Sequence, residues 1–245
     1  MELVGLTVTE AIVVCLSALA GGLIRGFTGF GSALVIAPIL SIAVGTHVAV
    51  PAIVLLLFVS TFQLIPGAAR DVNWRQILPL GIAGAIGAPI GVYALIAIDQ
   101  ELMRRMIAMV VLAFAVAMLA GWRFKREPGP LVTTSVGGVG GVLSGAGSVG
   151  GPPVILFLLA GPAAAAANRA AIIHYFFFTQ IVVLGMYWVE GIMIAKVLWL
   201  TALMLPTQMI GVAAGTKLFP KANETLYRRV ALIFLMLIGL AALAA

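Results

Sequence analysis

The sequence predicts an all-α integral membrane protein built from two inverted-topology repeats, and three observations lead to this fold class. Hydrophobic residues occupy 63% of the 245 positions and charged residues only 9%, whereas a soluble domain carries about 25% charged residues. Apolar runs recur along the whole chain. A glycine-rich pattern near the start returns midway, which indicates a duplicated unit.

Seven apolar runs are candidates for membrane helices, because a helix needs roughly 20 residues to cross the hydrocarbon layer of a bilayer. In chain order they cover residues 13–24, 48–65, 77–98, 106–120, 170–189, 197–214 and 230–245. The net charge of +6 would suggest nucleic acid in a soluble protein. Basic residues collect in the cytoplasmic loops of membrane proteins, so no nucleic-acid partner is expected.

Two glycine-rich stretches match each other without a gap. GGLIRGFTGFGSALVIAPIL begins at Gly21, and GGVLSGAGSVGGPPVILFLL begins at Gly140. Further on, AIGAPIG at 85–91 faces LPTQMIG at 205–211. These matches predict a first repeat over residues 1–122 and a second over 131–245, which together form one transmembrane domain. The charged segment 123–130 joins them as a cytoplasmic linker.

Each predicted repeat has a glycine-broken helical hairpin followed by three longer transmembrane helices. The hairpin either crosses the membrane fully or re-enters on the same side, and both alternatives give an odd number of crossings. The second repeat therefore enters the membrane in the opposite sense, with both chain ends outside. The charges agree, because basic residues favour the cytoplasmic side. That side holds Arg70, Arg75, Arg123, Lys125, Arg126, Lys217, Lys221, Arg228 and Arg229, and the other holds Arg104, Arg105 and Lys196.

The two hairpins are the predicted anion-binding elements. Irregular backbone survives in lipid only where it is buried in protein or lines a cavity, and a helix that restarts after a break attracts anions with its free N–H groups. Hydroxyl donors lie at the same places. Close helix packing is the alternative explanation for the glycines. The hairpin residues concerned are Gly26, Thr28, Gly29, Gly31 and Ser32, then Ser144, Gly145, Gly147, Ser148 and Gly150.

Two arginines fall inside or beside apolar runs. A charge within the membrane is costly and marks a functional hypothesis. Arg25 precedes the first break, and Arg169 lies near the start of a later run. Its neighbour Asn168 is a further candidate for substrate binding. Guanidinium groups suit carboxylates and sulfonates, so a two-point clamp on an anion is predicted. The alternatives are that Arg25 snorkels to the interface and that Arg169 marks a loop end.

Four other polar residues interrupt apolar segments and are candidates for the transport pathway or for coupling: His47, His174, Gln180 and Gln208. Histidine can carry a coupled proton, but a hydrogen-bonded core histidine is the alternative. Glutamine equally joins helices by hydrogen bonds. No acidic residue falls in the middle of a predicted span, which disfavours cation transport. The single cysteine excludes internal disulfides and multi-cysteine metal sites, and neither a metal nor another cofactor is expected.

The chain resembles the TauE/SafE family of sulfite-exporter-like permeases. The resemblance rests on the G-x-x-G-x-G break at Gly26, Gly29 and Gly31, the equivalent later cluster and the basic mid-chain linker. It implies a multi-pass protein of the cell inner membrane that carries sulfite, a sulfonate, a sulfoacetate-like compound or another small organic anion. It also implies functional positions at those glycines and at Gly145, Gly147 and Gly150. Ser148 and Val149 replace the first-half pair Gly29 and Phe30, so the hairpins differ.

These observations together predict a secondary transporter for a small anion that works by alternating access between the repeats. The expected partners are the anion and the lipid bilayer. An anion channel is the alternative, since it would share the electropositive lining. A membrane enzyme acting on lipid is disfavoured, because no catalytic carboxylate, cysteine or histidine cluster is visible. Proton or ion coupling, the direction of transport and the oligomeric state stay open at this level.

Overall fold

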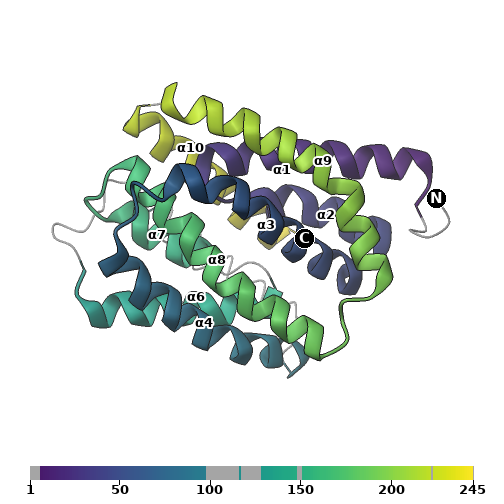
Figure 1. The fold of residues 1–245 in the computed structure, drawn as a ribbon, viewed down its shortest axis with the longest axis horizontal. Coiled ribbons are helices and arrows are strands. Elements are labelled where there is room, and N and C mark those ends of the chain that lie inside the picture. Colours follow the sequence, from purple (N-terminus) through teal and green to yellow (C-terminus); the bar gives the residue numbers. More distant parts are fainter. Residues whose placement is uncertain (1–5, 98–115, 117–127, 148–150, 222, 245) are drawn as a thin grey trace. The chain divides into compact units, whose positions relative to one another are not determined.

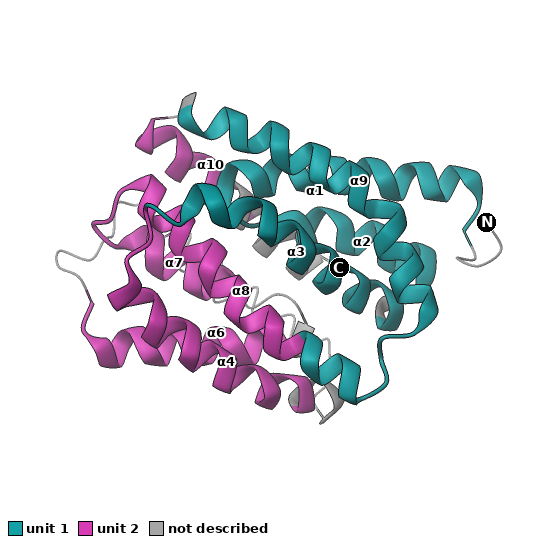
Figure 2. Cartoon of the chain, viewed as in Figure 1, with its two compact units in different colours: residues 1–70, 184–221 teal, residues 71–183, 222–245 magenta. Residues whose placement is uncertain are grey.

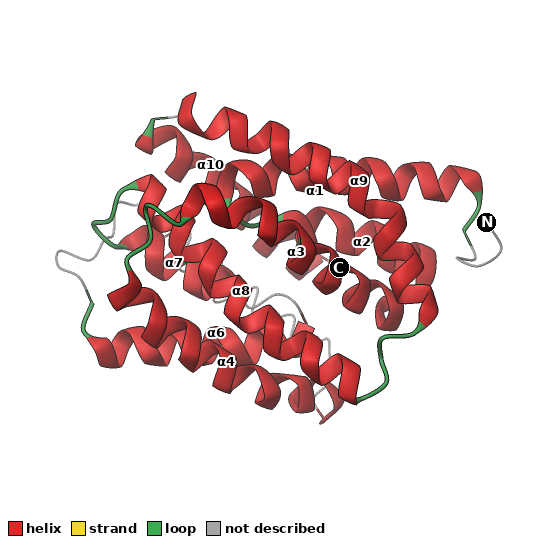
Figure 3. Cartoon of the chain, viewed as in Figure 1, coloured by secondary structure: helices red, strands yellow, loops and turns green. Residues whose placement is uncertain are grey.

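The computed structural model describes residues 6–97, 116, 128–147, 151–221 and 223–244, and their regular structure is helical with no strand (Figures 1 and 3). The elements in chain order are α1 (Val8–Thr28), α2 (Ser32–Val44), α3 (Thr46–Ala68), α4 (Trp74–Ala97), α6 (Pro130–Gly147), α7 (Gly151–Ala160), α8 (Ala165–Val189), α9 (Ala195–Leu218), the 3-10 turn η1 (Phe219–Lys221) and α10 (Glu224–Ala244). The all-helical prediction is confirmed for these residues.

Five described helices are long and apolar enough to cross a membrane: α1, α3, α4, α8 and α9. They contain the predicted runs 13–24, 48–65, 77–98, 170–189 and 197–214, except that residue 98 lies outside the described residues. The helix α10 begins at Glu224, before the predicted run 230–245. Apart from Val116, the run at 106–120 lies outside the described residues, as do the basic linker residues and Arg104 and Arg105. The second arms of the hairpins, α2 with 13 residues and α7 with 10, are shorter than the span that a bilayer needs.

Local chemistry explains where α1 begins and ends. The Thr7 hydroxyl accepts a hydrogen bond from Glu10 N, and the Glu10 carboxylate accepts one from Thr7 N at 2.8 Å. This capping box satisfies backbone donors that a helix start leaves free. At the other end Gly29 adopts a left-handed conformation with φ of 89°, which glycine alone among residues takes without strain. The capping box at Thr7 and the left-handed Gly29 therefore set where the 21-residue helix α1 begins and ends.

The chain forms two compact units, and each combines helices from both predicted repeats (Figure 2). Unit 1 comprises residues 1–70 and 184–221, so α1, α2 and α3 pack with α9. Unit 2 comprises residues 71–183 and 222–245, so α4 packs with α6, and α7 follows α6. The repeat boundaries stay a prediction, but the compact units cut across them.

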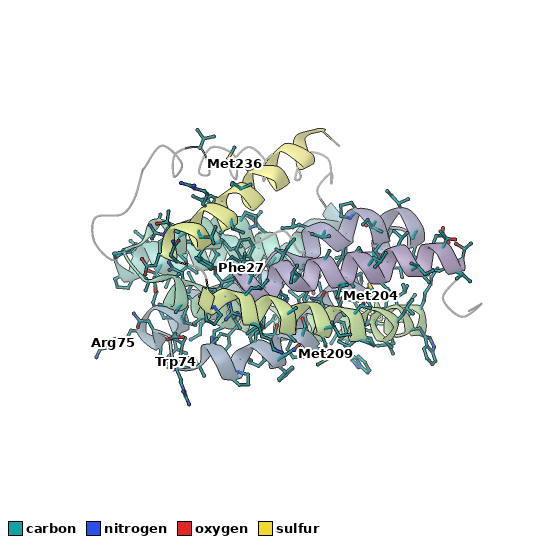
Figure 4. The ribbon with its side chains drawn as sticks, turned by 90° about the horizontal axis from the view of Figure 1, so that it is seen from above. Phe27, Trp74, Arg75, Met204, Met209 and Met236 are labelled. Carbon is teal, nitrogen blue, oxygen red and sulfur yellow. The ribbon has the colours of Figure 1, made fainter. Side chains whose placement is uncertain are left out.

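Unit 1 has an apolar core between its helices. Ile36 and Leu40 of α2, Leu56 of α3 and Leu200 and Met204 of α9 are fully buried in one cluster. Thr201 Oγ1 adds a hydrogen bond of 3.1 Å to the Ala52 carbonyl, which joins α9 to α3. Figure 4 labels Met204 and Met209 on α9; Met204 is buried, whereas Met209 is exposed.

Unit 2 is held together by contacts that involve backbone carbonyls. Tyr175 of α8 donates a hydrogen bond of 3.1 Å to the Gly137 carbonyl on α6. Arg228 of α10 donates one of 2.8 Å to the Gly161 carbonyl, which follows α7.

On α4, an apolar stripe spaced three to four residues apart is exposed, at Ile82, Ile86, Ile90 and Tyr93. A soluble protein rarely exposes such a surface, and lipid contact accounts for it.

One close helix pair occurs in each unit. A Cβ at Gly22 on α1 would strike the Gln208 carbonyl oxygen on α9, and a Cβ at Gly141 on α6 would strike the Gly84 carbonyl oxygen on α4. Small residues let membrane helices approach to backbone contact. Gly22 and Gly141 therefore make equivalent contacts in their own units, and the gap-free sequence match also sets these two glycines opposite each other. Two further pairs of contacts are equivalent between the units. The contact of Gly26 with Val212 in unit 1 corresponds to that of Gly145 with Ala88 in unit 2. The contact of Gly211 with Leu19 in unit 1 corresponds to that of Gly87 with Gly138 in unit 2.

These contacts change the expected match between the long partner helices. The sequence comparison set Gly91 opposite Gly211, but Gly87 is the residue that meets α6 as Gly211 meets α1. By these helix contacts, the position equivalent to Gly211 lies about one helical turn before Gly91. Sequence identity did not reveal this shift because positions 87 and 91 are both glycine, and only the contact with the partner helix distinguishes them.

Candidate functional site

The first hairpin break is a two-glycine turn in unit 1. Gly29 and Gly31 have φ of 89° and 96°, so both need the left-handed conformation that side chains disfavour. The Thr28 hydroxyl accepts a hydrogen bond of 3.2 Å from Phe30 N and lies 2.8 Å from the Ile24 carbonyl oxygen. Thr28, which was predicted to bind substrate, therefore supports the turn itself.

After the break, the N-terminus of α2 contains one member of a buried polar pair, Ser32 and Gln208. Gly31 precedes α2, and no side chain caps the helix start. Ser32 Oγ in the first turn accepts a hydrogen bond of 2.9 Å from Gln208 Nε2 of α9. Both side chains are completely buried, and Gln208 Oε1 has no hydrogen-bond partner. Two residues predicted separately, Ser32 and Gln208, are thus brought together.

Arg25 lies one turn before this break and is the main electrostatic feature of unit 1. Its side chain is 1% exposed, so it does not snorkel to the surface of the described structure. Nη2 donates to Thr61 Oγ1 at 2.7 Å and to the Leu57 carbonyl at 3.2 Å, both on α3. Nε is buried without a hydrogen-bond partner. Neutral groups alone thus hold the guanidinium within the part of the chain that the structure describes.

Such an arrangement leaves a positive charge without a compensating carboxylate among the described residues. Burial removes the hydration of the guanidinium, and a buried charge without an ionic partner is costly. A buried N–H without an acceptor adds a further penalty. An anion placed at Nε would relieve both costs. The prediction that Arg25 binds an anion therefore has a physical reason, and it stays a prediction.

Sequence reasoning missed the two α3 hydroxyls beside Arg25. Ser60 Oγ and Thr61 Oγ1 lie 3.0 Å and 2.7 Å from the Leu57 carbonyl oxygen, and both side chains are fully buried. The signal was present as a Ser-Thr pair inside the apolar run 48–65. Such a pair does not by itself mark a functional site, because serine and threonine in membrane helices usually bond to the preceding turn.

The second hairpin differs from the first at the same point. In the gap-free match, Ser144 stands where the first half has Arg25. Ser144 is buried in α6, and Gly145 packs against the Ala88 carbonyl of α4. Gly26 packs in the same way against Val212, so helix contact explains both glycines. Gly147 ends α6, while Ser148 and Gly150 lie outside the described residues.

The other predicted cation belongs to unit 2. Arg169 in the first turns of α8 is 5% exposed, and Asp71 and Tyr227 lie within electrostatic range of it. Its neighbour Asn168 donates a hydrogen bond of 3.1 Å to the Ala163 carbonyl, which closes the turn before α8. Arg25 and Arg169 lie in different units, and the two-point clamp stays a prediction.

The remaining candidates have structural surroundings of different kinds. His47 is exposed at the start of α3. His174 is buried, with Nδ1 2.8 Å from the Ala170 carbonyl oxygen and its ring 5.3 Å from that of Trp74. Trp74 lies at the first turn of α4, next to Arg75 (Figure 4). Gln180 is buried in α8. His174 thus has the surroundings of a hydrogen-bonded core histidine.

The chemistry available at these positions is that of binding. The Thr61 hydroxyl and the Leu57 carbonyl contact Arg25, and elsewhere in unit 1 the Gln208 amide contacts the Ser32 hydroxyl. The described residues contain no group of three or more histidine, cysteine or acidic side chains that could hold a metal ion. Guanidinium and hydroxyl groups donate hydrogen bonds and therefore suit oxygen-rich anions.

Comparison with known proteins agrees with this chemistry. The model of the family described as Sulfite exporter TauE/SafE matches residues 14–242. The match covers nearly the whole chain and confirms the resemblance that the glycine pattern indicated. No curated protein and no solved structure matches the chain.

Proposed function

Since the chain belongs to the TauE/SafE family of sulfite exporters, we propose that it is a secondary permease for a small sulfur-containing or organic anion, such as sulfite, a sulfonate or sulfoacetate. The family and the five apolar helices make the chain a multi-pass membrane protein of a transporter class, not an enzyme class. The carrying observation is Arg25, a fully buried guanidinium whose Nε has no hydrogen-bond partner. We place the protein in the cell inner membrane.

The proposed substrate site in unit 1 combines Arg25 with the start of α2. Arg25 supplies the positive charge, and the first turn of α2 supplies backbone N–H groups and the positive end of the helix dipole. The buried pair Ser32–Gln208 borders that turn. A small anion with several oxygens matches this set of donors better than a cation or a neutral apolar molecule.

Alternating access is the proposed mechanism. Each compact unit joins a glycine-broken hairpin from one half of the sequence to a long helix from the other half. Inverted repeats with broken helices near the midplane are a common architecture of secondary transporters. In this mechanism the two repeats rock against each other and expose the anion first to one side of the membrane and then to the other.

Counterflow in liposomes tests the proposed function. Purified protein is reconstituted into vesicles loaded with unlabelled sulfite, and the entry of radiolabelled sulfite is followed with methanesulfonate, sulfoacetate and acetate as competitors. A carrier gives transient, saturable accumulation that protein-free vesicles lack. Conductive flux without counterflow would identify a channel instead. Absence of saturable flux for every sulfur-containing and carboxylate anion would contradict the proposal.

A further inference from the structure

We propose that Ser144 on α6 and Gln180 on α8 form a binding site in unit 2 for a monovalent cation, with Na⁺ as the probe ion. The inference goes beyond the proposed function, because cation binding can be measured without transport. Its mechanistic consequence, which is coupling of anion movement to a cation gradient, rests on the proposed function. Both residues belong to the same compact unit, and their side chains are only 8% and 7% exposed.

The two residues occupy the positions that hold the Arg25–Thr61 pair in unit 1. In the gap-free sequence match, Ser144 falls on Arg25. The same spacing sets the end of α6 on the end of α1 and the start of α8 on the start of α3. Continued along these two helices, it sets Gln180 on Thr61. Ser144 and Gln180 are therefore the counterparts of a pair that unit 1 joins by a hydrogen bond of 2.7 Å.

The chemistry of the pair is reversed between the units. Arg25 is a cation that donates to Thr61, whereas Ser144 and Gln180 are neutral. Ser144 Oγ and Gln180 Oε1 are buried, and neither oxygen has a hydrogen-bond partner. The Tyr175 hydroxyl lies near Ser144, but it donates its hydrogen to a backbone carbonyl of α6. Buried oxygens without a partner cost free energy, and a bound ion is one way to recover it.

The end of α6 favours a positive charge beside Ser144. The last carbonyl groups of a helix have no partner within it, and they form the negative end of the helix dipole, which stabilises cations. The last turn of α1 contains Arg25, whereas the last turn of α6 contains no basic residue. A cation bound at Ser144 would thus take the place that the guanidinium has in unit 1.

The available ligands suit a monovalent ion. In secondary transporters, backbone carbonyls and the C-terminal ends of broken helices coordinate Na⁺. A hydroxyl oxygen, an amide oxygen and the carbonyls at the end of α6 are ligands of the same neutral kind. Divalent ions instead prefer carboxylate, histidine or cysteine ligands, and the part of the chain that the structure describes has no cluster of three such side chains.

Thermal unfolding of the purified full-length protein in detergent tests the site. Melting temperatures are measured while NaCl replaces choline chloride, which keeps ionic strength and chloride constant. Ser144→Ala and Gln180→Leu each remove one oxygen ligand, and Gln180→Glu keeps an oxygen as the conservative variant. The matched control is Thr179→Val. Thr179 is buried in the same helix as Gln180, and its hydroxyl already bonds to the backbone carbonyls of Tyr175 and Phe176.

We expect Na⁺ to raise the melting temperature of the unaltered protein in a saturable manner, because a ligand that binds the folded state stabilises it. Ser144→Ala or Gln180→Leu should raise the half-maximal Na⁺ concentration at least about tenfold, which corresponds to the loss of one polar contact. Gln180→Glu and Thr179→Val should keep the response of the unaltered protein.

Equal melting temperatures in NaCl and choline chloride would overturn the cation site while the permease function stands. An unchanged Na⁺ response in both Ser144→Ala and Gln180→Leu, or an equal loss in Thr179→Val, would overturn it as well. Coupling is measured separately, as sulfite uptake into vesicles with and without an inward Na⁺ gradient. Uptake that the gradient does not accelerate would contradict coupling. If the unaltered protein carried no anion at all, the proposed function would be wrong, and the melting data alone would decide the cation site.

Discussion

Arg25 Nη2 on α1 donates a hydrogen bond of 2.7 Å to Thr61 Oγ1 in the middle of α3. This bond joins the helix that precedes the first glycine break to α3, for which the sequence predicts only a membrane-spanning helix. Because Thr61 is neutral, it orients the guanidinium without cancelling its charge. The charge is thereby available to a ligand, at some cost in stability.

The first prediction separates the stability role of Arg25 from its transport role. Arg25→Met keeps an unbranched side chain and removes the buried charge. A buried charge without an ionic partner carries a desolvation cost that an apolar side chain avoids. We expect an equal or higher melting temperature in detergent. Counterflow of sulfite should fall at least about tenfold, because bonds to charged groups contribute most to binding.

The control for this variant is Arg75→Met. Arg75 is exposed at the first turn of α4. Its replacement should therefore leave the half-saturation concentration for sulfite and the melting temperature nearly unchanged. Sulfite counterflow that survived intact in Arg25→Met would contradict a binding role for Arg25.

The second prediction concerns the close contact between α1 and α9. Gly22→Ala would place a Cβ against the backbone of Gln208 and Val212, and the helices would have to separate. We expect a loss of about 1–3 kcal/mol in unfolding free energy, measured by denaturant titration in mixed micelles. Gly185→Ala is the matched control, because a Cβ there meets nothing within 4 Å. That variant should be neutral or slightly stabilising.

The third prediction tests the Ser32–Gln208 bond by a double-mutant cycle. Ser32→Ala removes the acceptor and leaves the buried Gln208 amide with both ends unpaired. We expect a loss of about 1–3 kcal/mol in unfolding free energy. Ser32→Ala combined with Gln208→Leu should recover part of it, because no buried polar group is then left unpaired. Strictly additive losses would show that the bond does not couple the residues.

The fourth prediction concerns the left-handed turn. Gly29→Ala and Gly31→Ala should each lose about 1–2 kcal/mol in unfolding free energy, because their φ values of 89° and 96° strain any side chain. Gly67→Ala in α3 is the control, since its Cβ meets no neighbour within 4 Å. Melting temperatures in detergent measure the difference. Equal values for Gly29→Ala and Gly67→Ala would argue against the turn.

The fifth prediction tests the inverted topology. In a Cys15→Ala background, Asn73→Cys lies between α3 and α4, and Glu190→Cys follows α8. Both positions are exposed. The positive-inside bias puts the first loop in the cytoplasm and the second outside. A membrane-impermeant thiol reagent applied to intact cells should label Glu190→Cys and spare Asn73→Cys. Labelling of both from the same side would refute the predicted topology.

Several features were predictable from the sequence because they depend on neighbours along the chain. Apolar runs of sufficient length form helices in either half, and the described helices contain most of them. Gly29 and Gly31 lie at a helix break, as their pattern predicted. The pattern did not distinguish them from Gly26, which lies inside α1 and packs on α9. Whether a glycine turns the chain or lets helices touch depends on the partner it meets.

By itself, the sequence determined an all-helical membrane chain, its glycine break, its repeated pattern and its family. Only the tertiary structure decided that Arg25 binds Thr61 and Leu57, that Gln208 meets Ser32, and that each compact unit draws on both halves. The physical reason is that helices apolar on every side carry no pattern that specifies which face packs inward. Rotation and register of each helix are settled by contacts between residues far apart in the chain.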